Sequence, residues 1–128
     1  MPRYKIIEIY TSEETKWHRR PVHSAVIECM SSLKIPVRTI VTRGIGGAYE
    51  NGEITAGGFD ILSCKGPIHI TIILNADYFD DILSKVQEMV PEGIITARDV
   101  EVLVHRAHGV FYVQSARVEG IMAPSPRQ

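Results

Sequence analysis

The sequence predicts an α+β domain with the ferredoxin-like order strand–helix–strand–strand–helix–strand (βαββαβ), in which an antiparallel sheet carries both helices on one face. Two segments repeat apolar residues at three- and four-residue steps, which is typical of amphipathic helices. Segments rich in β-branched residues flank them and predict the strands. The length of 128 residues fits one domain.

The first half of the chain predicts a strand, a helix and a second strand. Residues 4–11 are rich in Ile and Tyr, and residues 37–43 are β-branched. Pro21 suits the first position of the helix because its missing N–H would have no helical partner there, and Pro36 ends the helix. The apolar stripe of this helix consists of Val22, Ala25, Val26, Cys29, Met30 and Leu33.

A long connection follows at residues 44–57. It is polar and small, with an Asn51-Gly52 turn signal, and connections of this length in a compact domain are often functional. We expect residues 47–57 to form a mobile loop. The third strand is predicted in two pieces, 58–63 and 68–74, separated by a turn at Gly66-Pro67.

The second helix is predicted from about Asp77 to Val90, closed by Pro91 and Gly93. Its apolar stripe consists of Tyr78, Phe79, Ile82, Leu83, Val86, Met89 and Val90. Residues 99–105 alternate between Val and polar or larger residues, which predicts the last strand.

The pattern divides the chain into a domain at residues 1–106 and a C-terminal extension at 107–128. Residues 110–118 have a strand pattern, and we expect the last residues to be disordered. The sheet face without helices should carry Thr39, Thr71 and Leu103 among others. Such a half-apolar face predicts burial by another copy of the chain.

Composition narrows the class of protein. The net charge of −1 and the pI of about 6.5 argue against a nucleic-acid binder, which usually has a basic surface. No apolar run approaches the ~20 residues that span a bilayer, and the start of the sequence has no signal-peptide core. The two cysteines, Cys29 and Cys64, are too few for a disulfide framework, so we expect a reducing, cytoplasmic location.

Three segments are candidates for binding an anion. Arg43, Gly44, Gly46 and Gly47 stand at a strand end, where backbone N–H groups can cradle a phosphate. A turn that merely needs glycine is the competing interpretation.

The second candidate is the run Lys16, Trp17, His18, Arg19 and Arg20, which leads into a helix N-terminus and offers cations beside a stacking surface. A solvated basic turn, with Trp17 covering the core edge, is equally consistent. The third candidate is the segment 91–98, in which Gly93 frees the backbone and Arg98 carries charge; a simple helix stop is the alternative.

Catalytic and metal signals are weak. His105 and His108 could place two imidazoles together, but no third ligand stands at a fixed spacing from them. His69 is the remaining candidate metal ligand. No nucleophile or metalloprotease motif is present, so we expect a protein that is not an enzyme. An oligomeric enzyme with an interface active site would have His18, His23 and Asp60 as its suspects.

Three motifs in order resemble a known family. These are K-W-H-x-x-P at 16–21, T-R-G-I-x-G at 42–47, and M-V-P-E-G-I-I-T-A-R-D-V-E-V at 89–102. Together they resemble the PII-like domain-of-unknown-function family 190, over about residues 4–106. One glycine, Gly93, stands where PII proteins have their phosphate loop, and no lysine directly follows it. This departure argues against triphosphate binding in the PII manner and leaves a smaller anion, such as AMP, a cyclic nucleotide or bicarbonate, as the candidate ligand.

The resemblance implies a homotrimeric signal-transduction protein. It would bind a small anionic effector, expected to be an adenine nucleotide, between subunits. It would signal through the loop 47–57 to a protein partner such as a membrane transporter. It would require no cofactor. The expected site residues are Lys16, Trp17, His18, Arg19, Arg20, Arg43, Gly44, Gly46, Gly47, Gly93 and Arg98. A metal-binding trimer similar to the copper-tolerance proteins is the alternative within this fold.

Overall fold

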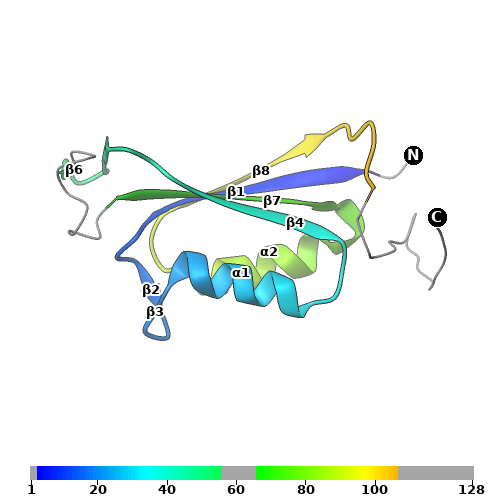
Figure 1. The fold of residues 1–128 in the computed structure, drawn as a ribbon, viewed down its shortest axis with the longest axis horizontal. Helices are drawn as coiled ribbons and strands as arrows, with labels where there is room; N and C mark the ends of the chain where they lie inside the picture. Colours follow the sequence, from blue (N-terminus) through cyan, green and yellow to red (C-terminus); the bar gives the residue numbers. More distant parts are fainter. Residues whose placement is uncertain (1–2, 56–65, 107–128) are drawn as a thin grey trace.

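The computed structural model describes residues 3–55 and 66–106. A four-stranded antiparallel sheet in the order β4-β7-β1-β8 is covered on one face by two helices (Figure 1). The strands are β1 (Tyr4–Ser12), β4 (Val37–Arg43), β7 (Pro67–Asn75) and β8 (Ile94–Val100), and the helices are α1 (Val22–Ser32) and α2 (Phe79–Met89). The predicted α+β, ferredoxin-like arrangement is therefore confirmed.

The core lies between the sheet and the helices. Alternate residues of the two central strands point toward the helices and are fully buried, namely Ile7, Ile9, Ile70, Ile72 and Leu74. Both predicted helix stripes face them: Val26 and Val86 are completely buried, and the other stripe residues are buried or packed against the core cluster. Burial of this many branched side chains is the main stabilising contribution to the sheet–helix interface.

The prediction for the last strand was wrong. The strand is β8 at Ile94–Val100, paired with β1 from Tyr10↔Ile94 to Tyr4↔Val100, and residues 101–106 are not in a strand. β8 is an edge strand with mostly exposed side chains, so its own sequence lacks the alternation that the following Val-rich segment has. Pairing with β1, which is non-local, decides the register.

Smaller differences concern element ends. Pro21 is the N-cap residue of α1 rather than its first helical residue, and the helix ends at Ser32. The short 3-10 turn Ala76–Tyr78 precedes α2, and Asn75 caps it by accepting a hydrogen bond from the Asp77 N–H. The predicted strand at 58–63 and the C-terminal extension 107–128, with its strand pattern at 110–118, lie outside the described residues.

Among the described residues, no helix covers the second face of the sheet. Tyr10, Ile40 and Ile94 each expose about 40 to 50% of their surface there. Thr71 lies on this face as predicted, but Thr39 pairs with the buried Ile72 and so shares the helix side. Leu103 follows β8 and is exposed.

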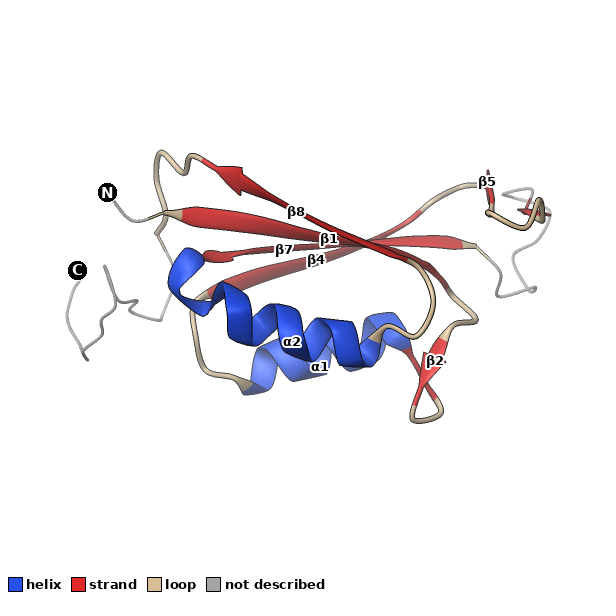
Figure 2. Cartoon of the chain, turned by 180° about the vertical axis from the view of Figure 1, so that it is seen from behind, coloured by secondary structure: helices blue, strands red, loops and turns tan. Residues whose placement is uncertain are grey.

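Two small hairpins leave the same end of the sheet. β2 (Lys16–Trp17) pairs with β3 (Arg20–Pro21), and β5 (Gly47–Ala48) pairs with β6 (Ile54–Thr55). The β2–β3 hairpin turns toward the helix side, whereas the β5–β6 hairpin extends beyond the strand ends (Figures 1 and 2). In the described part of the predicted loop, residues 47–55 are thus a hairpin rather than an open coil. Across the described residues, no helix is long and apolar enough to cross a membrane.

Candidate functional site

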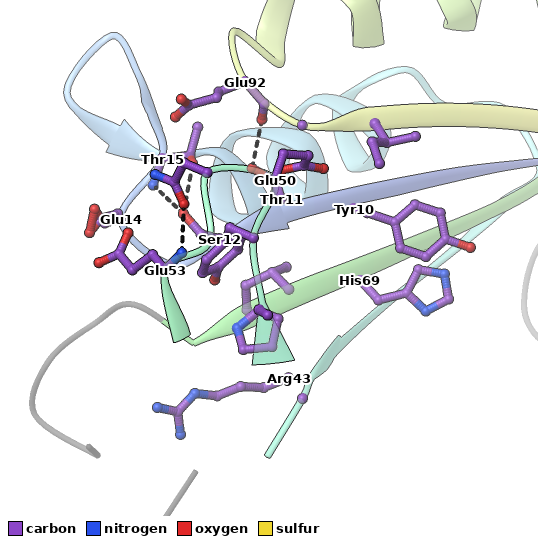
Figure 3. A pocket seen from close by; sticks show the side chains of 18 of the residues that line it. Tyr10, Thr11, Ser12, Glu14, Thr15, Arg43, Glu50, Glu53, His69 and Glu92 are labelled. Carbon is purple, nitrogen blue, oxygen red and sulfur yellow. Dashed lines mark hydrogen bonds between the residues drawn. The ribbon is translucent and has the colours of Figure 1, made fainter. Parts of the chain in front are cut away.

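A cleft of about 750 Å³ opens where β1, β4 and β7 meet the β5–β6 hairpin (Figure 3). The ends of β1, β4 and β7, together with the entry to β8, form one wall, which we call the sheet wall; Tyr10, Thr11, Ile68, Gly93 and Ile94 belong to it. Residues 48–53 form the opposite wall, which we call the hairpin wall. The volume is within the range of small-molecule pockets.

Hydrogen bonds and close packing fix the sheet wall. The Thr11 hydroxyl donates to the Glu92 carbonyl over 3.0 Å, which ties the entry of β8 to β1. Gly93 has φ +139, and a Cβ there would lie 2.4 Å from the Tyr10 carbonyl oxygen. Ser12 and Thr15 share a hydroxyl hydrogen bond of 2.7 Å, and both are buried. This wall therefore needs glycine at position 93 for structural reasons.

The hairpin wall is built by the predicted Asn51-Gly52 turn. The Gly52 N–H donates to the Tyr49 carbonyl, the Asn51 side chain accepts from the Glu53 N–H, and Gly52 has φ +89. A turn followed by a left-handed glycine is a common hairpin connection. Its residues are mostly exposed. The turn of this wall is therefore closed by local hydrogen bonds.

Arg43 and Gly44, both expected site residues, line the cleft, but each already has a protein partner. The Arg43 Nε lies 3.0 Å from a Glu13 carboxylate oxygen, and the other oxygen of that carboxylate accepts from the Gly66 N–H. The Gly44 N–H donates to the Pro67 carbonyl over 2.9 Å, and a Cβ at Gly44 would lie 2.8 Å from Pro67. Gly44 is thus required by packing against Pro67, and its N–H is not available to cradle a phosphate.

An aromatic pair extends the sheet wall onto the open face. The rings of Tyr10 and His69 stack with centroids 4.7 Å apart and an interplanar angle of 6°. Glu8 lies beside both: one oxygen accepts from the Tyr10 hydroxyl, and the other is 3.5 Å from the His69 Nε2. Burial and the Glu8 carboxylate raise the pKa of the Tyr10 phenol, so Tyr10 keeps its proton.

The charge on the lining is predominantly negative. Glu14, Glu50, Glu53 and Glu92 line the cleft together with Arg43, which is paired with Glu13. Burial, followed by the carboxylates of Glu14 and Glu53, raises the pKa of the Tyr49 phenol. In one chain, this cleft therefore disfavours a bare anion.

Most of the other predicted site residues lie elsewhere. None of Lys16, Trp17, His18, Arg19, Arg20, Gly46, Gly47 and Arg98 lines the cleft. Arg98 lies on β8 opposite Ile6, with its Nε 3.9 Å from Glu8. Trp17 packs against the core edge and stacks on His18 at 3.7 Å, so it is not a free stacking surface. Of the eleven expected residues, the cleft brings together Arg43, Gly44 and Gly93.

The histidine candidates are apart. His69 lies beside Tyr10, whereas the His105 Nδ1 is 2.7 Å from the Tyr4 hydroxyl, at the other end of β1. The two tyrosines are six positions apart along β1, which is about 20 Å at ~3.3 Å per residue. His108 and Asp60 lie outside the described residues. Among the described residues, no group of three or more His, Cys, Asp or Glu side chains is arranged to hold a metal ion.

Several lining residues escape sequence reasoning. Tyr10, Thr11 and Ile94 come together only through the β1–β8 pairing, and the segment containing Ile94 was predicted to be a loop. The sequence placed the carboxylates at positions 50 and 53 in a polar loop. It did not indicate that this loop is a hairpin on which both carboxylates face the cleft. The one feature of the sequence that could have pointed to these lining residues is the place of Tyr10 near the end of a predicted strand.

One comparison with known proteins bears on the whole domain. A protein-family model described as an uncharacterised ancient conserved region matches residues 4–102. The match contains β1 through β8 and every described residue of the cleft.

Proposed function

The chain belongs to domain-of-unknown-function family 190, which is PII-like, and on this premise we propose that it is a regulatory protein rather than an enzyme. In this proposal a small effector binds in the cleft, changes the position of the β5–β6 hairpin, and so alters contacts with a protein partner. The observation that carries the proposal is the composition of the cleft. One wall is fixed to the core, and the other belongs to an exposed hairpin.

A ligand between such walls is coupled to the hairpin. It can shift the hairpin only by contacting it differently in two positions, and residues 48–53 offer those contacts. The hairpin region also exposes apolar side chains: Ile45 is 89% and Ile54 72% exposed. Exposed apolar side chains on and beside the β5–β6 hairpin fit a protein partner whose binding depends on the position of the hairpin.

We propose an adenine nucleotide as the effector. The flat Tyr10–His69 pair suits a heteroaromatic base, and Arg43 retains guanidinium N–H groups beyond its contact with Glu13. Because carboxylates line the cleft, the phosphates need a counter-charge, either a Mg²⁺ ion carried by the nucleotide or cations from a neighbouring copy. A homotrimer would cover the open sheet face, on which Tyr10, Ile40 and Ile94 are exposed.

A thermal-shift screen tests the function. The effectors are ATP, AMP, cyclic nucleotides and bicarbonate, each with and without Mg²⁺, and transition metals alone. A ligand at one hundred times its dissociation constant should stabilise the fold by about 2.7 kcal/mol. We expect a shift with a nucleotide that Arg43→Ala weakens and Lys85→Ala, an exposed change on α2, does not. A thermal shift with transition metals alone, or no shift with any of the compounds, would contradict the proposal.

A further inference from the structure

The β2–β3 hairpin has an unusual turn. Its two central residues, His18 and Arg19, have φ values of +54 and +69, and neither is glycine. Two-residue hairpins adopt this left-handed turn because it matches strand twist, and they normally place Asn or Gly there. An arginine in this conformation is uncommon, so its side chain calls for a reason.

Contacts explain the neighbours of Arg19 but not Arg19 itself. His18 stacks on Trp17, which packs against the core, and Arg20 contacts the Glu28 carboxylate on α1. Within residues 3–55 and 66–106, the side chains of Lys16 and Arg19 make no hydrogen bond or ion pair, and both residues are exposed. The hairpin is therefore an anchored projection that presents unpaired cations.

The cleft has the complementary charge. Glu14, Glu50 and Glu92 line it, while its one arginine is paired with Glu13. The hairpin turns toward the helix side of the sheet (Figures 1 and 2), and none of residues 16–21 lines the cleft of the same molecule. A second molecule offers the same acidic cleft to the same basic tip.

We propose that the tip of the β2–β3 hairpin of one copy docks into the cleft of a second copy, so that Lys16 and Arg19 complete the cleft from outside. The contact joins two different surfaces, so it repeats head to tail and closes into a ring where the rotation allows. It deepens the proposed function, on which it rests for the cleft being the effector site: the neighbouring copy supplies the cations that a phosphate needs there.

Other anionic partners fit the tip less well. A nucleic acid or an anionic membrane is bound by an extended basic surface, whereas the chain has a net charge of −1 and the tip offers two unpaired cations besides His18. A projecting two-residue turn is convex, so a complementary cleft is a better match than a small molecule alone.

Sedimentation velocity on the full chain without nucleotide tests the proposal. At low salt, Arg19→Glu and Glu50→Lys should each weaken self-association by ~10-fold or more, because each places like charges together. The double variant Arg19→Glu/Glu50→Lys should recover most of the affinity. Salt should weaken the association of the natural protein, since the contact is ionic.

Two variants separate docking from folding. Arg19→Gly relieves the left-handed turn, so it should leave the fold as stable or more stable and still weaken association. Lys85→Glu changes the net charge equally outside both surfaces and should have no effect. A monomeric natural protein, unchanged association in Arg19→Gly, or a double variant without recovery would overturn the proposal.

The result is independent of the effector screen. If association ignores Arg19 but a nucleotide still stabilises the protein in an Arg43-dependent way, the hairpin proposal fails and the proposed function stands. If no nucleotide binds but the charge swap behaves as expected, the hairpin contact stands and the effector assignment fails.

Discussion

The two walls of the cleft differ in what holds them. The sheet wall continues into the core, where Ile68 is 4% and Ile70 0% exposed, and its entry to β8 is tied to β1. The hairpin wall is closed by the local hydrogen bonds of one turn, and the next residue of the same hairpin, Ile54, is 72% exposed. Segments with few buried contacts open at low free energy, so the two walls should respond differently to the same ligand.

Because of this difference, the two walls can have separate functions in binding a ligand. A packed wall keeps the binding geometry constant, whereas a weakly packed wall can change position at small cost. A regulatory cleft needs both properties, because a ligand must be recognised and its presence must be passed on.

The largest expected contrast lies in isoleucine truncation. Ile70→Ala should cost about 3–4 kcal/mol of unfolding free energy, because the side chain is fully buried between sheet and helices. Ile54→Ala should change it by less than about 0.5 kcal/mol, because the side chain is mostly exposed. Urea unfolding of both variants measures the contrast, and equal losses would show that the hairpin wall is packed as firmly as the sheet wall.

The two glycines with positive φ among the described residues give the next contrast. Gly93→Ala should cost about 2–3 kcal/mol, because the new methyl group meets the Tyr10 carbonyl in addition to the backbone strain. Gly52→Ala should cost about 1 kcal/mol, because only the backbone is strained and no atom lies within 4 Å of the new Cβ. The same denaturation measurement applies, and a larger loss at Gly52 would contradict the assignment of the fixed wall.

A smaller effect is expected from the tie between β1 and β8. Thr11→Val keeps the side-chain shape, removes the hydroxyl donor, and leaves the Glu92 carbonyl without that bond. We expect the free energy of unfolding, measured by urea denaturation, to fall by about 1 kcal/mol. Thr42→Val is the matched control, because its hydroxyl bond to the His69 carbonyl is exposed and should contribute less.

The smallest effect lies away from both walls, at the far end of β1. Burial, and then the charge of Arg38, lower the pKa of His105, whose Nδ1 faces the Tyr4 hydroxyl. The unfolded chain therefore binds the proton more readily than the folded one. Above about pH 6.5, His105 is neutral in the unfolded chain as well and does not change the free energy of unfolding. Below that pH, protonation favours the unfolded chain, so the free energy of unfolding falls. The loss should shrink in His105→Asn, measured by thermal unfolding between pH 8 and 5; an unchanged pH dependence would contradict it.

The predictable parts of the molecule were the locally encoded ones. The two helix stripes, the strands around Ile7 and Ile70, and the Asn51-Gly52 turn each follow from periodicity or turn chemistry. β8 was misplaced because it is an exposed edge strand whose register depends on β1.

The site was predictable only in part for the same reason. Arg43 could be proposed from its place at a strand end, and Gly93 from its place after the second helix. The meeting of Tyr10, His69 and Ile94 depends instead on pairing between distant segments. Lys16–Arg20 was correctly recognised as basic, but its direction depends on the left-handed turn at His18 and Arg19, which no glycine signals.

Hydrogen–deuterium exchange with and without the nucleotide found in the screen tests the central claim most directly. Bound nucleotide should slow exchange at residues 47–55 much more than in the core strands around Ile9 and Ile70. The substitution Arg43→Ala should remove this protection. Unchanged exchange at 47–55 under a nucleotide that does stabilise the protein would contradict it, because the effector would then bind without engaging the hairpin wall.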